Sequence, residues 1–67
     1  MDIRHRLSAN MKRLRKARSW SQEELADQAG LHRTYISGVE RCVRNPTITV
    51  VEKIALALGA GYDELLG

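Results

Sequence analysis

Apolar and polar residues alternate with helical periodicity along the whole of this 67-residue chain. In its first part, apolar residues recur every three or four positions, at Ile3, Leu7, Met11 and Leu14. This spacing places them on one face of a helix and predicts a first helix over about residues 2–18. No stretch alternates with the two-residue period of a strand, so the pattern indicates an all-α protein.

A second and a third helix are predicted within residues 21–41. Ser21 and Glu24 have the spacing of a capping box, which starts the second helix at Ser21. The apolar side chains that this helix buries are expected to be Leu25, Ala26 and Ala29. Gly30 is expected to end it as a left-handed cap. The third helix follows at once, over about residues 32–41.

The rest of the chain predicts a loop and two further helices. Residues 42–46 form a polar loop, after which Pro46 and Thr47 open a fourth helix. Its expected inward face consists of Val51, Ile54, Ala55 and Leu58. Two glycines then interrupt the chain before a last short helix over residues 62–66.

The predicted third helix has two unlike faces. Ile36 and Val39 mark the face that packs inward. The other face carries a polar stripe, at about 100° per residue, formed by Arg33, Thr34, Ser37, Gly38 and Arg41. Its cationic donor, its hydroxyls and its position without a side chain suit entry into a DNA groove. Because glycine costs about 1 kcal/mol inside a helix, we expect Gly38 to allow a close approach by DNA or by the second helix.

The distribution of charge is more informative than its total. The formal net charge is +3 and the isoelectric point is near 9.5. The basic residues crowd the predicted first helix, at Arg4, Arg6, Lys12, Arg13, Arg15, Lys16 and Arg18. A clustered basic surface suits a polyanion, and the alternative is an ordinary solvated helix face.

Composition also bounds the compartment and the chemistry of the chain. The single cysteine excludes an internal disulfide and a multi-cysteine zinc site, and neither histidine has metal-ligand spacing with it. No apolar run approaches the roughly 20 residues of a membrane span, and the start of the chain lacks a signal-peptide pattern. We therefore expect one cytoplasmic domain, residues 1–67, with no membrane contact, metal, cofactor or small-molecule ligand.

Five segments of the chain match a known pattern: WSQEELA at residues 20–26, AGL at 29–31, YISGVE at 35–40, RNPT at 44–47 and IALAL at 54–58. With them the chain resembles the phage Cro and lambda-repressor type of helix-turn-helix domain. This resemblance runs over about residues 7–66, implies a compact five-helix fold and puts the helix-turn-helix at about residues 21–41. RTYISGVER, at residues 33–41, is similar to the recognition helix of restriction–modification controller proteins, which are small dimeric regulators.

The resemblance implies roles for individual residues. The positions implied to read bases are Arg33, Thr34, Ser37 and Gly38. The positions implied to contact phosphates are Gln22, Arg41, Arg44, Asn45 and the amide of Thr47. Gln22 is also implied to buttress the recognition helix, and Arg15 and Glu40 are implied to form a buried ion pair between the first and third helices. Tyr35 stays open between half-burial and a phosphate contact through its hydroxyl.

Two positions depart from the pattern of the family. Cys42 stands where the family usually has Gly or Asn, so either the turn is strained or its geometry differs. Leu56 stands where the family commonly has Lys or Arg, on the predicted outer face of the fourth helix. Together with Ala60, Tyr62 and Leu65 it indicates a self-association patch, the candidate dimer interface, although a single exposed leucine is common.

These features favour a sequence-specific DNA-binding transcription regulator. Such a protein binds a roughly palindromic operator as a homodimer, with its third helix in the major groove of double-stranded DNA. The alternative is a protein-interaction module such as an antitoxin or adaptor. Such modules usually carry an added partner-binding segment, whereas this chain ends after its predicted fifth helix. An enzyme is not expected, because two histidines and one cysteine in a small core do not supply a converging catalytic set.

Overall fold

The computed structural model describes residues 2–67 and confirms the all-α fold. Its five helices are α1 (Ile3–Ala17), α2 (Gln22–Ala29), α3 (Arg33–Glu40), α4 (Ile48–Leu58) and α5 (Tyr62–Leu66). The predicted bounds agree with these within one or two residues. Within residues 2–67 no helix has both the length and the apolarity of a membrane span.

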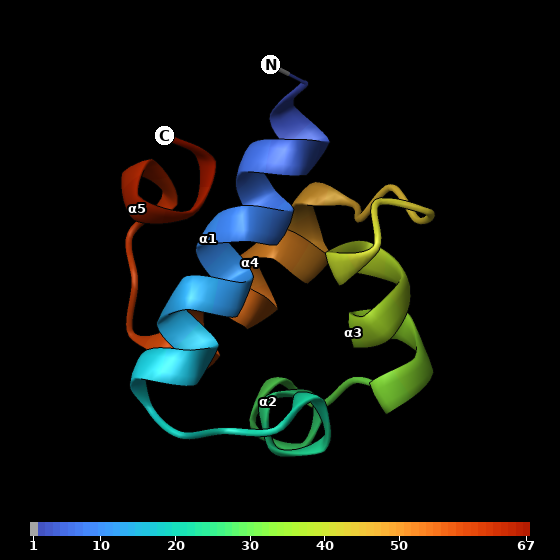
Figure 1. Ribbon diagram of the computed structural model, residues 1–67, viewed down its shortest axis with the longest axis vertical. Coiled ribbons are helices and arrows are strands. Elements are labelled where there is room, and N and C mark those ends of the chain that lie inside the picture. Colours follow the sequence, from blue (N-terminus) through green and yellow to red (C-terminus); the bar gives the residue numbers. More distant parts are fainter. Residues whose placement is uncertain (1) are drawn as a thin grey trace.

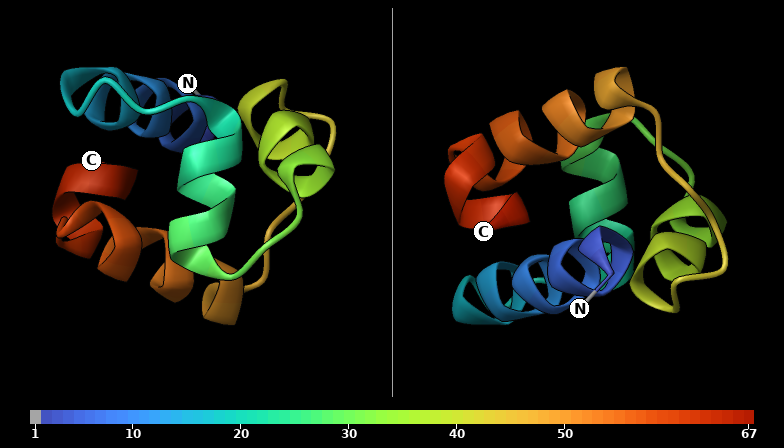
Figure 2. Two further views of the ribbon diagram at one scale, coloured as in Figure 1. Left: turned by 90° about the horizontal axis from the view of Figure 1, so that it is seen from below. Right: turned by 90° about the horizontal axis from the view of Figure 1, so that it is seen from above.

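The helices pack as a small cluster in which α2 crosses one end of the molecule. Figure 1 shows α2 at the bottom of the view, below α1 and α4, with α3 and α5 on opposite sides of the molecule. Figure 2 shows α2 running from the side of α1 to the side of α4. α2 packs against both α3 and α4, and α5 packs mainly on α1. As a result, α3 keeps one long face that no other helix covers.

Signals at the helix ends explain why the bounds were predictable. Ser21 and Thr47 cap α2 and α4, since each hydroxyl accepts a hydrogen bond from the backbone N–H three residues on, at 3.0 and 3.2 Å. Gly30 and Gly59 end the same helices with φ of 69° and 62°, a left-handed conformation that costs glycine little. His32 occupies the capping position of α3, but its side chain makes no capping hydrogen bond.

α3 ends in a left-handed turn at Cys42, which has φ of 62°. The N–H of Cys42 donates to the carbonyl of Val39 at 3.1 Å, and the N–H of Val43 donates to that of Gly38 at 3.0 Å. This is the Schellman arrangement that commonly closes a helix around glycine. The turn therefore keeps that geometry and is strained, because a residue with a Cβ loses about 1–2 kcal/mol there.

One contiguous core joins all the helices. Its buried apolar side chains are Leu7, Met11, Leu25, Ala26, Ala29, Ile36, Val39, Val51, Ile54, Ala55, Leu58 and Leu65. Every residue expected on the inward faces of α2, α3 and α4 is among them. Ile3 is different: its spacing matches the inward face of α1, but it lies in the first turn, past the end of the core, and is 57% exposed.

The expectation that Leu65 belongs to a surface patch is wrong. Its side chain is fully buried where α5 packs on α1, and the side-chain amide of Asn10 donates to its carbonyl at 2.8 Å. α5 is a single short turn, so the spacing of its apolar residues does not reveal which side faces inward. Leu65 is therefore a core residue and is unavailable to a second molecule.

Candidate DNA-binding surface

The uncovered face of α3 carries most of the predicted polar stripe. Arg33, Thr34 and Arg41 are exposed and Ser37 is half-buried. Neither arginine forms an ion pair within residues 2–67. A row of donors without internal partners, on the outer face of a helix at the edge of the molecule, is available to an external acceptor such as a base edge.

Gly38 does not lie open on this face. It is buried beneath the side chain of Arg44, which comes from the loop that follows α3. A Cβ at position 38 would lie only 2.9 Å from Cγ and Cδ of Arg44. The close approach expected at Gly38 therefore exists, but an arginine of the same chain makes it, in place of DNA or the second helix. Gly38 itself offers no surface that could read a base.

Arg44 is held by a second contact, with the ring of Tyr35. Its guanidinium carbon lies 5.6 Å from the ring centroid, a cation–π distance. Tyr35 is half-buried and packs against the core, which agrees with the first of the two alternatives given for it, half-burial. Packing on Gly38 and the cation–π contact with Tyr35 together hold the side chain of Arg44 along the edge of the α3 surface.

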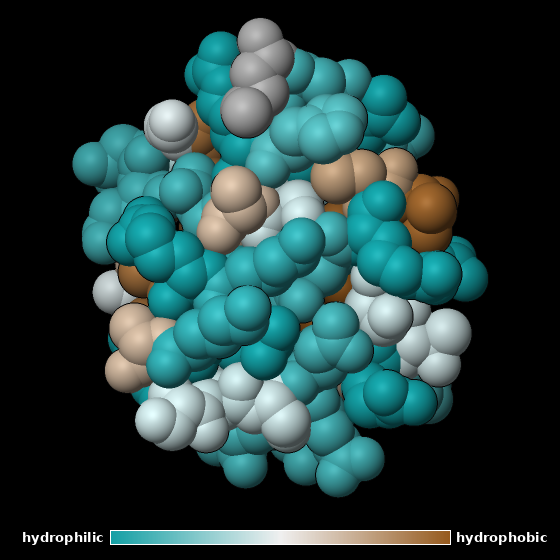
Figure 3. All heavy atoms as spheres, viewed as in Figure 1, coloured by the Kyte–Doolittle hydropathy of each residue, from teal (hydrophilic) through white to brown (hydrophobic). Residues whose placement is uncertain are grey.

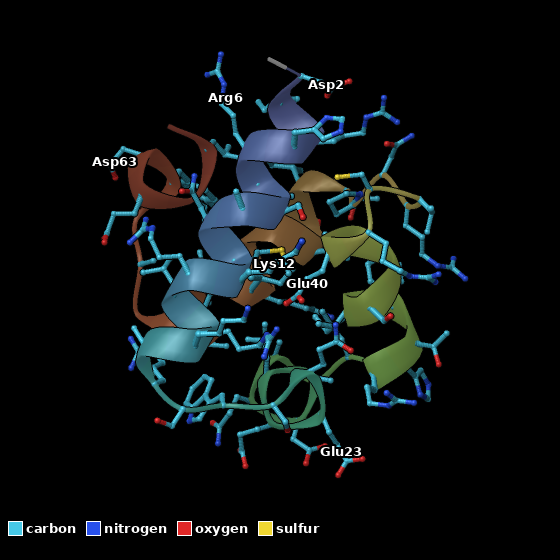
Figure 4. All side chains as sticks on the ribbon, viewed as in Figure 1. Asp2, Arg6, Lys12, Glu23, Glu40 and Asp63 are labelled. Atoms are coloured by element: carbon cyan, nitrogen blue, oxygen red, sulfur yellow. The ribbon has the colours of Figure 1, made fainter. Side chains whose placement is uncertain are left out.

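Glu40 is the centre of a buried polar network behind α3. Arg15 reaches it from α1 with two parallel hydrogen bonds, Nε to Oε2 at 2.9 Å and Nη2 to Oε1 at 3.0 Å. The remaining Nη1 of Arg15 donates to the carbonyl of Trp20 at 2.9 Å. The side chains of Arg15 and Glu40 are only 11% and 3% exposed, which confirms the predicted ion pair as a tie between α1 and α3. Figure 4 shows Glu40 between these helices, whereas Glu23 points outward from α2.

Gln22 joins this network from the start of α2. Its side-chain amide donates to Oε1 of Glu40 at 3.1 Å, which accounts for the expected support of α3. An amide nitrogen carries two hydrogens, so the second N–H of Gln22 remains at the first turn of α2. Helix N-termini favour phosphate groups because their first N–H groups are unpaired and the dipole is positive there.

The loop between α3 and α4 provides the other flank of the surface. Arg44, Asn45 and Thr47 are all exposed, and Thr47 opens α4 toward this side. Nη1 of Arg4 donates to Oδ1 of Asn45 at 3.3 Å, so α1 contributes a cation to the loop. No local pattern predicts this contact, because 41 residues separate its partners.

Arg4 also binds Asp2, and the side-chain and backbone hydrogen bonds from Arg4 lower the pKa of Asp2 to about 2.

The face of the molecule that α1 covers is basic. Every charged side chain of α1 is an arginine or lysine, and Figure 3 shows a largely hydrophilic surface over this helix. Lys12 is exposed on it and lies in a shallow groove with Arg41, beside the end of α3. The basic surface is thus continuous with the α3 stripe, as a polyanion partner requires.

The candidate dimer interface is reduced to three residues at the end of α4 and the start of α5. Leu56 is 77% exposed, Tyr62 is 46% exposed and Ala60 is half-buried. We refer to these three as the α4–α5 patch. It lies on the side of the molecule away from α3 (Figure 1).

Two short helices joined through a left-handed glycine, the second with an uncovered polar face, define a helix-turn-helix protein. A helix-turn-helix family profile matches residues 11–65. The chain belongs to this family, in the Cro and lambda-repressor branch that its sequence resembles.

Its relatives are named as transcription regulators and control proteins. A hypothetical transcription factor of Neisseria meningitidis is 49% identical over 65 residues, which cover 97% of this chain and 61% of that protein. Its crystal structure superposes with a TM-score of 0.95, at 48% identity, over 98% of this chain and 76% of that one. Control protein C.SmaI of Serratia marcescens is 44% identical over 98% of this chain and 79% of its own length.

A third relative has been solved with DNA. The restriction–modification controller protein C.Esp1396I, described as a tetramer in complex with its natural 35 base-pair operator, superposes with a TM-score of 0.86. The two chains are 33% identical, and the match covers 100% of this chain and 99% of that one. The family, the five-helix fold and the likeness to restriction–modification controller proteins predicted from the sequence are therefore confirmed.

Proposed function

We propose that this protein regulates transcription as a homodimer that binds a roughly palindromic operator, with α3 of each subunit in a major groove. It acts in the manner of restriction–modification controller proteins and has no catalytic role. Because its target is chromosomal or plasmid DNA, the protein works in the cytoplasm.

The observation that carries this proposal is the uncovered face of α3, with Arg33 and Thr34 at its first turn. In a helix-turn-helix, the N-terminal residues of the second helix contact base edges. An arginine there can donate to both O6 and N7 of a guanine, a contact that discriminates by about 1–3 kcal/mol against other bases. The hydroxyl of Thr34 donates or accepts, and its methyl suits the methyl group of thymine.

The flanks of α3 suit the sugar–phosphate backbone on either side of the groove. On one side lies the start of α2, where Gln22 keeps an N–H free. On the other side lie Arg41, Arg44, Asn45 and the N-terminus of α4 at Thr47. Phosphate contacts of this kind position a protein on the duplex without reading its sequence. We propose these residues as the phosphate-contacting set.

We propose that the subunits pair on the operator. A two-fold symmetric operator presents its half-sites one helical turn apart, about 34 Å, and each receives one recognition helix. The operator-bound assembly of C.Esp1396I, which this chain matches over its full length, supports a pairing of this kind here.

The proposal is tested by selecting bound duplexes from a random pool. We expect enrichment of a two-fold symmetric consensus, in which the most discriminated positions lie about one helical turn apart. Control selections with Arg33→Ala should recover a consensus that is relaxed at one position in each half. Equal retention of all duplexes by the wild-type protein contradicts the proposal. Capture of a toxin-like protein together with weak DNA binding favours the interaction-module alternative.

A further inference from the structure

A shallow groove lies between the outer face of α1 and the end of α3. Its volume is about 520 Å³, and it is lined by His5, Ser8, Ala9, Lys12, Glu40, Arg41 and Cys42. We refer to it as the α1/α3 groove. Its two permanent cations come from different elements, since Lys12 belongs to α1 and Arg41 directly follows α3. Figure 4 shows Lys12 on α1 next to Glu40 of α3.

The two cations of the groove are not neutralised by the protein. Lys12 and Arg41 are both exposed, and within residues 2–67 the ion pairs are formed by other arginines, Arg4 and Arg15. The positions one helical turn from Lys12, at 8, 9, 15 and 16, hold Ser, Ala, Arg and Lys. An ordinary solvated helix face often pairs a lysine with a carboxylate at this spacing. Here the lysine has no such partner on its own helix.

The acidic and hydroxyl groups that line the groove are already bound. The carboxylate of Glu40 accepts hydrogen bonds from Arg15 and from the amide of Gln22. The hydroxyl of Ser8 donates to the backbone carbonyl of Glu40. The groove therefore presents two cations and no carboxylate that is free to pair with them. Such a site is complementary to an external anion.

The position of the groove indicates which anion this is. Arg41 belongs both to the groove and to the polar stripe of α3, so the groove continues the proposed DNA-binding surface. A helix with its side chains is about 10–12 Å across, and the major groove of DNA is about 12 Å wide. A recognition helix therefore fills the major groove, and protein surface beside that helix faces the sugar–phosphate backbone.

We propose that Lys12 and Arg41 together bind a backbone phosphate of the operator in the α1/α3 groove. The inference rests on the proposed function, because it adds a contact to the same DNA-binding surface. It makes α1 a third phosphate-binding element, besides the start of α2 and the loop between α3 and α4. It gives Lys12 a role that the helix-turn-helix motif does not supply.

The neighbouring cation Arg13 provides a matched control. Its Nη2 donates to Oδ1 of Asn10 at 3.4 Å, and Asn10 in turn donates to the carbonyl of Leu65 in α5. Arg13 thus lies on the side of α1 toward α5, and it does not line the α1/α3 groove. Lys12→Gln and Arg13→Gln each remove one positive charge from an exposed position of the same helix. Equal melting curves for the two variants check that both fold.

The first measurement is the affinity for the selected duplex as a function of salt. Lys12→Gln should lower the slope of log affinity against log salt by about 0.9, which one phosphate contact contributes, and should weaken binding about 8-fold at 0.1 M salt. Lys12→Arg should restore the slope. Arg13→Gln should leave the slope unchanged and the affinity within about 2-fold of the wild type, because salt screens a distant charge.

Ethylation interference then shows whether the contact is direct. In this measurement, ethylation of a single phosphate weakens binding wherever the protein contacts that phosphate. The wild-type protein and Arg13→Gln should be sensitive at the same phosphates. Lys12→Gln should lose its sensitivity at one phosphate in each half-site, and Arg41→Gln should lose it at the same one.

The outcomes separate this inference from the proposed function. If Lys12→Gln keeps the wild-type slope and every sensitive phosphate, or if Arg13→Gln loses as much affinity as Lys12→Gln does, the groove binds no phosphate although the regulator still binds DNA. If the wild-type protein selects no duplex, the proposed function itself fails.

Discussion

The two sides of α3 use arginine in opposite ways. Behind the helix, the side-chain nitrogens of Arg15 and the carboxylate oxygens of Glu40 all have hydrogen-bond partners, which are each other, the amide of Gln22 and the carbonyl of Trp20. In front of it, Arg33 and Arg41 have no ion-pair partner within residues 2–67. A charged group whose hydrogen bonds are satisfied internally stabilises the fold, whereas one left to solvent is free to recognise another molecule. The comparison predicts that the two sides respond differently to substitution.

The largest expected effect is loss of stability on removing Glu40. Glu40→Ala strands the buried guanidinium of Arg15, which typically costs about 3–5 kcal/mol. For a 67-residue domain, whose hydrophobic core supplies only about 3–5 kcal/mol, that is most of the free energy of unfolding. Thermal or urea denaturation measures the change, with Glu52→Ala, an exposed carboxylate on α4, as the matched control. A Glu40→Ala melting curve equal to that of the wild type would show that the network is not structural.

On the front of α3, substitution should change DNA binding without changing stability. Arg33→Ala removes an exposed side chain, so the free energy of unfolding should stay within about 0.5 kcal/mol of the wild type. Affinity for the selected site should fall by the equivalent of about 1–3 kcal/mol. Fluorescence anisotropy titrations measure this loss. A drop in melting temperature without a loss of affinity would mean that Arg33 belongs with the internal residues.

Arg44 has features of both the internal and the exposed arginines. Its side chain packs on Tyr35 and Gly38, but the residue remains exposed. Arg44→Ala should weaken binding to all sequences alike and lower the slope of log affinity against log salt by about 1. Loss of the cation–π contact should cost about 0.5–1 kcal/mol of stability. Tyr35→Phe keeps the aromatic ring, so it should preserve the cation–π contact with Arg44. A base-specific loss in Arg44→Ala would show that Arg44 reads sequence.

The smallest effect is expected at Gly38, and its sign depends on Arg44. The three atoms nearest to an added Cβ all belong to the flexible side chain of Arg44, while alanine is favoured over glycine in a helix by about 0.5–1 kcal/mol. Gly38→Ala in an Arg44→Ala background should therefore be more stable than its parent by that amount. In the wild-type background the gain should be smaller, and DNA affinity should fall because Arg44 is displaced. Identical gains in stability in both backgrounds would show that the side chain of Arg44 does not pack on Gly38.

The fold was predictable from the sequence wherever the decisive signals are local. Capping residues such as Ser21 and Thr47, and the helical spacing of residues such as Ile36 and Val39, act within one or two turns. The identity of the Arg15–Glu40 pair came from the family resemblance, because residues so far apart are joined only by packing.

The features that escaped prediction depend on contacts between distant segments. Burial of Leu65 follows from the docking of α5 on α1, and the cover over Gly38 follows from the path of the loop after α3. The exposure of Ile3 likewise follows from the position of the first turn of α1 past the end of the core, which the helical spacing of its apolar residues does not show. The DNA-contacting roles of α3 and its flanks stay predictions.

The central claim is that the uncovered face of α3 touches base edges, and one measurement tests it directly. The affinities of the wild-type protein and of Arg33→Ala are compared on every single base-pair variant of the selected site. If Arg33 contacts a base, the two proteins differ in preference at one position in each half-site and agree at all others. Preference profiles that are the same at every position, at any overall affinity, would contradict the claim.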